Sequence, residues 1–233
     1  MFGGVSLKDP KVKTLVSVTS YELINFMYNT LTESGWKSTF NYSKRSPTKF
    51  VSKTLEIPQG SISGFNKYFN YCYLFSRNFK EKDEAARYSK NNGTSIYFSV
   101  VLYWLLVYFG VLDESRLKLC QGYFSYRVRE DKVPQTRYRA GLHAWLSYNC
   151  SVIDTTIWQQ EELFDFQNYD SKHPVITGNI PRGMTLIGFE ENKSLAKEYA
   201  RNFARDSKLT FCEWVIYHKQ QADLLYNNSL HLV

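Results

Sequence analysis

The longest apolar run of the chain covers residues 93–112 and contains no charged side chain. A run of this length either crosses a bilayer as a helix or forms the buried central helix of a large domain. Its Ser, Thr, Tyr and Trp side chains are spread along the run, whereas the aromatic groups of a membrane span gather at its two ends. We therefore expect a buried core helix and no membrane span.

Apolar and alternating patterns predict three strands after this helix. The first covers residues 117–128, and a charged loop over 129–139 follows it. The other two cover residues 142–148 and 151–156, and the turn-forming pair Asn149-Cys150 joins them. So short a connection predicts an antiparallel hairpin.

Helical periodicity predicts further helices on both sides of these elements. They fall within or cover residues 8–34, 65–75, 82–90, 159–169, 191–205 and 209–227. Turn-forming residues predict loops with short extended pieces over 36–64 and irregular or extended chain over 172–188. We therefore expect an α+β fold, in which a buried central helix packs on an antiparallel sheet and extra helices lie at both ends.

Length and composition fit a folded chain with a sizeable core. The 233 residues are 43% hydrophobic and 22% charged, which is usual for globular domains. No internal repeat or low-complexity linker divides the chain. We expect a mostly helical N-terminal extension over 1–90, a core over 91–170 and a C-terminal helical part of the same domain over 171–233.

The net charge of +7 permits contact with an acidic partner. However, Lys and Arg are dispersed, and no basic stripe with stacking aromatic residues indicates a nucleic-acid site. We therefore expect a solvated basic surface and a protein or peptide partner, not nucleic acid or a membrane. The N-terminus lacks the basic and apolar regions of a signal peptide, which favours a cytoplasmic protein and leaves leaderless export open.

Cysteine usage indicates reduced thiols and no metal site. Cys72, Cys120, Cys150 and Cys212 stand far apart, without the Cys-x-x-Cys or Cys/His spacing of zinc sites. We expect Cys120 and Cys150 to be buried structural thiols and Cys212 to lie in the apolar face of a helix. No motif implies a cofactor.

The predicted hairpin carries the strongest chemical signal. His143 begins its first strand and Asp154 lies near the end of the second, so antiparallel pairing can bring them together. An imidazole held by a carboxylate is the base half of a nucleophilic triad. Trp145 falls on the same side of the strand as His143, where it could wall a site or pack in the core. In the structural alternative, His143 is merely hydrogen-bonded and Asp154 closes a turn.

The order of these elements resembles the catalytic core of the transglutaminase-like branch of papain-like cysteine enzymes. The resemblance rests on four motifs: Gly93-Thr94-Ser95, Cys120-Gln121-Gly122-Tyr123, His143-Ala144-Trp145 and Ile153-Asp154-Thr155-Thr156. It implies an acyl-transfer enzyme or an amide or peptide hydrolase. In that site Ser95 would be the nucleophile, His143 the base and Asp154 the orienting acid, with Thr94 and Trp145 at the substrate.

The chain departs from this family at the nucleophile. The family has cysteine at the position of Ser95, where the N-terminus of a helix favours a thiolate. A serine hydroxyl gains too little from the helix to ionise and needs His143 as a true general base. Ser95 is therefore the nucleophile of a Ser-His-Asp triad, the remnant of an inactive site, an engineered replacement of cysteine, or only the cap of the helix. Cys72 is the substitute nucleophile should the predicted helix be misaligned with the family.

Other classes of function stay open. The first alternative is a non-catalytic protein- or peptide-binding module on the same fold. A weaker alternative is a protein that resembles ADP-ribosyltransferases, suggested by Arg182 and the segment 181–189 before the predicted helix 191–205. The Ser-Thr-Ser strand and paired Glu of that family are not evident in the sequence. A nucleic-acid-binding protein is equally weak.

Overall fold

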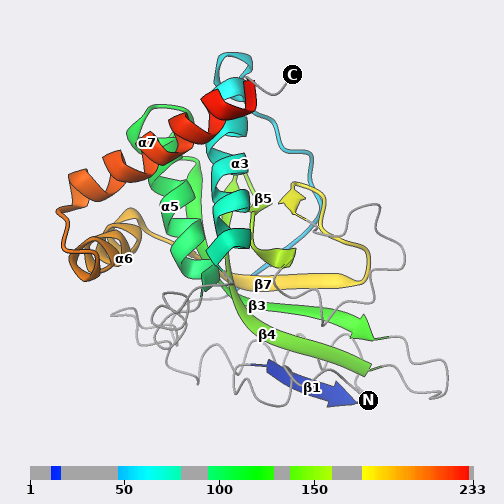
Figure 1. The fold of residues 1–233 in the computed structure, drawn as a ribbon. Coiled ribbons are helices and arrows are strands. Elements are labelled where there is room, and N and C mark those ends of the chain that lie inside the picture. The colour runs from blue at the N-terminus through cyan, green and yellow to red at the C-terminus, as the bar shows by residue number, and fades with distance from the viewer. Residues whose placement is uncertain (1–11, 17–46, 80–93, 129–136, 159–174, 231–233) are drawn as a thin grey trace.

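The structure is a computed structural model, and it describes residues 12–16, 47–79, 94–128, 137–158 and 175–230. The fold is α+β, as predicted: helices gather on one side of a curled antiparallel sheet (Figure 1). The helices are the short 3-10 helix η2 (Gln59–Ser61), α3 (Ile62–Phe79), α5 (Thr94–Tyr108), α6 (Lys193–Asp206) and α7 (Phe211–Leu230). The strands are β1 (Val12–Val16), β2 (Thr48–Phe50), β3 (Leu117–Val128), β4 (Arg137–Tyr148), β5 (Ser151–Asp154), β6 (Ile176–Thr177) and β7 (Met184–Glu191).

The sheet has the order β2-β7-β3-β4-β5-β6, and β1 pairs with β4 outside this path. β1 occupies one end of the free edge of β4, opposite residues 137–141, and β5 occupies the other end, opposite residues 146–148. The sheet therefore takes strands from all three predicted segments of the chain.

Local sequence patterns predicted β3 and the described α-helices well. They predicted less well the strands that pair with distant parts of the chain. The strand predicted over 117–128 is confirmed, and α3, α6 and α7 lie close to their predicted ranges. The loop predicted over 129–139 is wrong at its end, because Arg137 continues β4 opposite Val128. Helix within 8–34 is wrong for residues 12–16, which form β1, whereas the irregular or extended chain predicted over 172–188 contains β6 and the first part of β7. These strands form because a partner strand offers hydrogen bonds that no local pattern reports.

Some predictions fall where the structure gives no description. The helices predicted over 82–90 and 159–169 lie outside the described residues, as does most of 8–34.

The helix α5 forms the centre of the molecule. Every residue from Ile96 to Leu106 is buried, so the helix is covered on all sides. It lies between the sheet and helices α3, α6 and α7 (Figure 1). The prediction of a buried core helix is confirmed, and no helix within the described ranges is long and apolar enough to cross a membrane.

The two ends of the curled sheet are joined by hydrogen bonds. The Lys53 amide, after β2, donates to the Gly178 carbonyl, after β6 (3.1 Å), and the Gly178 amide donates to the Val152 carbonyl (2.7 Å). The Ser52 hydroxyl also bridges the Ile180 amide and carbonyl at 2.9 and 3.2 Å. The sheet therefore has an inside and an outside.

Each side of the sheet carries its own apolar cluster. The helix-side cluster joins the four long helices to Ala144, Leu146 and Tyr148 of β4. The inner cluster, inside the curl, is made of Phe50, Cys120, Phe124, Trp145, Val152, Ile157, Ile176, Met184 and Leu186. The curl brings Phe50 of β2 to within 5.3 Å of Trp145, ring centre to ring centre, although β7 and β3 separate their strands.

The tight curl depends on two glycines that lie opposite each other, Gly122 of β3 and Gly188 of β7. A Cβ atom on Gly122 would lie 2.1 Å from the Ile187 carbonyl oxygen, and one on Gly188 would lie 2.9 Å from the Trp145 ring. These positions exclude side chains because neighbouring backbone and the Trp145 indole already fill the space.

We predict that Gly122→Ala lowers the free energy of unfolding by about 2 kcal/mol or more, because the methyl group must push β7 away from β3. Gly60→Ala is the matched control, since no atom lies within 4 Å of a Cβ built there. Urea unfolding followed by circular dichroism measures both. Equal midpoints for the two variants would contradict the role of the glycine pair.

A buried histidine links three helices. The His218 ring of α7 meets the Tyr71 hydroxyl of α3 through Nδ1 (2.8 Å) and the Tyr97 hydroxyl of α5 through Nε2 (3.2 Å). A neutral imidazole has one donor and one acceptor, so one tyrosine accepts and the other donates. Burial lowers the pKa of His218 from 6.5 to about 3. The ring therefore stays neutral in the folded protein.

This histidine predicts acid sensitivity. Unfolded His218 takes up a proton near its ordinary pKa of 6.5 and folded His218 only near 3, so its stabilisation is complete above 6.5 and is lost as the pH falls toward 3. The loss amounts to at most about 1.4 kcal/mol per pH unit. Urea unfolding across this range should show a shallower decline for His218→Gln than for the unaltered chain. Parallel declines would show that another group causes the acid sensitivity.

Candidate functional site

The hairpin of β4 and β5 brings His143 and Asp154 together, as predicted. The last paired residues of the two strands are Leu146 and Ile153, and Asp154 follows directly. His143 Nε2 lies 2.6 Å from Asp154 Oδ2, and neither side chain has any exposed surface. The pair is therefore a short, fully buried contact between an imidazole and a carboxylate.

The second carboxylate oxygen of Asp154 is also occupied. Its Oδ1 accepts hydrogen bonds from the Thr156 amide (2.7 Å) and the Thr156 hydroxyl (3.0 Å). This contact from an aspartate to the amide two residues later closes a turn and ends the strand. Asp154 therefore both closes a turn, as in the structural alternative, and holds the histidine.

The contact with Asp154 determines how the His143 ring is used. A carboxylate accepts a hydrogen bond, so Nε2 is the donor in this contact and Nδ1 is the ring nitrogen that faces away from Asp154. Nδ1 is buried and has no hydrogen-bond partner among the described residues, and the same holds for Trp145 Nε1 and Ser147 Oγ. These three residues alternate along β4 and point into the curl. Nδ1 is the atom that any chemistry at His143 would use.

Trp145 lies on the same side of β4 as His143, as predicted. Their rings are nearly parallel, 21° apart, with centres 6.2 Å apart, and Phe124 meets the His143 ring edge-on at 5.7 Å. Trp145 is completely buried in the inner cluster, where it also contacts Phe50. In this structure the indole packs in the core, and the predicted substrate-binding role has no exposed surface to use.

Ser95 lies on the other side of the sheet. One turn later on α5, the Ser99 hydroxyl donates to the Ala144 carbonyl (3.2 Å), and the Ala144 side chain belongs to the helix-side cluster. Because successive side chains of a strand point to opposite faces, His143 points away from α5. No hydrogen bond joins Ser95 to His143 in the described part of the chain. The described residues thus bring the base and the acid together, and the predicted role of Ser95 as their nucleophile stays a prediction.

Thr94 follows the same logic. It begins α5, as the predicted helix start requires, and so lies outside the curl with Ser95. Its predicted place at a substrate stays a prediction.

The cysteines divide into two kinds. Cys72 and Cys120 are buried, and burial raises the pKa of both thiols, so neither forms a thiolate readily. Cys150 and Cys212 are exposed, which overturns the expectation that they are buried. Cys150 lies at φ 67° in the tight turn between β4 and β5, and a residue at the tip of such a turn points to solvent.

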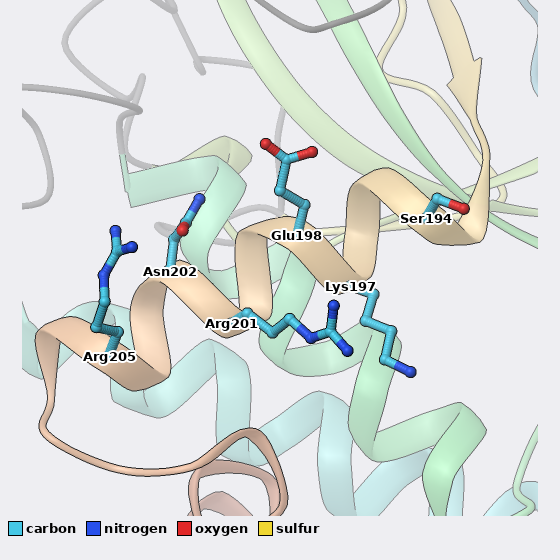
Figure 2. Close-up of a pocket in the computed structure, with 6 residues that line it drawn as sticks. All are labelled: Ser194, Lys197, Glu198, Arg201, Asn202 and Arg205. Carbon is cyan, nitrogen blue, oxygen red and sulfur yellow. The ribbon is translucent and has the colours of Figure 1, made fainter.

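A second feature lies on the surface, at α6. A hollow of about 580 Å³ is bounded, among the described residues, by one face of this helix, formed by Ser194, Lys197, Glu198, Arg201, Asn202 and Arg205 (Figure 2). The helical pattern indicates these polar residues as the outer face but does not show that they border a concave surface. Within the described ranges, no group of His, Cys, Asp and Glu could hold a metal ion.

No family model matches the sequence, and neither a curated protein nor a solved structure shows detectable similarity to it. The resemblance to transglutaminase-like enzymes therefore depends on residues 93–156 alone and stays a hypothesis. For the ADP-ribosyltransferase-like alternative, Arg182 is exposed and pairs with no described residue.

We predict that Asp154→Ala lowers the free energy of unfolding by about 3 kcal/mol or more, because it leaves a buried imidazole and the Thr156 amide without their acceptor. Asp113→Ala is the matched control: Asp113 caps the amide and hydroxyl of Ser115 in the same way, but it is exposed and holds no histidine. The same preparations allow nitrogen-15 NMR of the histidines. A His143 ring protonated at Nδ1 instead of Nε2 would contradict the assignment, as would equal effects of the two substitutions.

Proposed function

We propose that this chain is a non-catalytic protein- or peptide-binding module, in which the His143–Asp154 pair stabilises the fold. The observation that supports this most directly is the arrangement of β4. Its Ala144 faces α5 and the neighbouring His143 faces the inside of the curl. The sheet itself therefore stands between the helix that carries Ser95 and the imidazole that would activate it.

Chemical requirements favour the same proposal. A nucleophile must lie within hydrogen-bond reach of its base, roughly 2.6–3.2 Å. His143 Nδ1 has no partner of any kind in the described part of the chain, and both carboxylate oxygens of Asp154 are engaged. A substrate carbonyl would have to enter the apolar interior of the curl to reach the ring. The pair instead links β4 to β5 at the point where their ladder ends.

A second candidate function is acyl transfer or amide hydrolysis of the transglutaminase-like type. It is favoured by the 2.6 Å contact between His143 and Asp154, which orients the ring as a general base requires. It needs a nucleophile on the inner side of β4 and an opening to Nδ1. The two candidates differ in one respect: in the enzyme, His143 activates the side chain at position 95 as a nucleophile, and in the binding module it does not.

A thiol placed at position 95 tests this difference. In a background with the exposed cysteines replaced (Cys150→Gly, Cys212→Ser), we predict that Ser95→Cys reacts with a thiol-directed acyl probe at a rate that His143→Gln does not change. Ser194→Cys is the matched control, because Ser194 is the second residue of α6 as Ser95 is of α5. It reports the effect of the helix N-terminus alone.

The rates of the two thiols separate the candidates. A rate at Ser95→Cys that exceeds the control and falls with His143→Gln, in a variant whose circular dichroism is unchanged, would overturn the binding-module proposal and support the enzyme. Mass spectrometry of the labelled peptides identifies the modified position.

A further inference from the structure

We propose that the outer face of α6 is the docking site of this module, and that it takes an acidic, extended peptide segment of a protein partner. The inference rests on the proposed binding function and names the surface and the chemistry of its partner. It starts from the hollow of about 580 Å³ that the outer side chains of α6 border.

The cationic side chains of this face form a row. Lys197, Arg201 and Arg205 follow one another at intervals of four residues, which places neighbours about 6 Å apart along the helix. Alternate residues of an extended peptide, which point to the same side, are about 6.6–6.8 Å apart. Acidic residues at every second position of such a peptide can therefore meet successive cations.

The row is open to a partner. Arg201 is exposed and forms no ion pair with a described residue, and Arg205 approaches only the neighbouring Asp206, at 4.0 Å between two exposed side chains. Lys197 lies 5.9 Å from the centre of the Phe211 ring. Lys193, just before the row, is by contrast neutralised by Glu114 at 2.7 Å. Within the described fold, no close carboxylate neutralises the positive charges of Lys197 and Arg201, and Arg205 has only the distant contact with Asp206.

The other lining residues favour a peptide over a nucleic acid. Figure 2 shows Glu198 and Asn202 projecting from one side of α6, while Lys197 extends from another. None of the described lining residues is an aromatic that could stack on a base, as sites for single-stranded nucleic acid require. Asn202 and Ser194 can donate and accept, as the amides of a peptide backbone require.

The inner side of α6 holds this face in place. Leu195, Ala200 and Phe203 are buried against the core. The Trp104 indole of α5 also donates to the Ala196 carbonyl at 3.1 Å. A helix fixed in this way presents its outer charges with little loss of freedom on binding.

Fluorescence anisotropy with a labelled peptide of alternating Glu and Ser tests the proposal on the full chain. We expect saturable binding that weakens with salt, and a loss of affinity of about fivefold or more for Arg201→Glu. Arg182→Glu is the matched control, since it makes the same charge change at an exposed arginine outside the hollow. Glu198→Gln should change affinity in the opposite direction, toward tighter binding.

Several outcomes would overturn the inference. The first is that the acidic peptide does not bind. The second is that Arg201→Glu and Arg182→Glu lower the affinity for the peptide equally. The third is that a labelled oligothymidylate binds more tightly than the peptide and that its binding depends on Arg201. A peptide of alternating Gln and Ser that binds as well would also overturn it, because charge would then play no part. None of these results bears on the thiol reactivity at position 95, so a failure here is distinct from a failure of the proposed function.

Discussion

The alternation of side chains along β4 is the constraint on which the rest of the structure depends. Ala144, Leu146 and Tyr148 of this strand pack under the helices. His143, just before Ala144, and Trp145, between Ala144 and Leu146, point the other way, into the curl. Because the period of a strand is two residues, a shift of one residue would exchange the two sets and place polar groups under α5. The register of β4 against β3 therefore decides both apolar clusters at once.

The curl of the sheet turns a common hairpin motif into a buried one. Gly122 and Gly188 let β3 and β7 approach without side chains between them, and the joined ends at Lys53 and Gly178 close the curl. The His143–Asp154 pair is thereby enclosed with aromatic rings. Among the described residues, no nucleophile contacts His143 Nδ1, and the contact of Nε2 with Asp154 joins β4 to β5.

The surface at α6 depends on the same core from its other side. The helix is fastened to α5 by the contact between Trp104 and Ala196 and by its apolar residues. Its outer charged side chains border the hollow. Binding at this surface requires no access to the interior, which fits a protein whose polar buried groups are enclosed.

The sequence by itself determined the kind of most elements. The all-round apolar pattern of α5, the strand 117–128 and the hairpin around Asn149 follow from local periodicity and turn chemistry, and so does the nearness of His143 to Asp154. It did not determine β1, β7 or the first residues of β4, because their hydrogen bonds come from strands distant in the chain. Only the tertiary structure decided that His143 faces away from the helix of Ser95. The physical reason is that alternation defines two faces of a strand, whereas long-range packing chooses which face meets the helices.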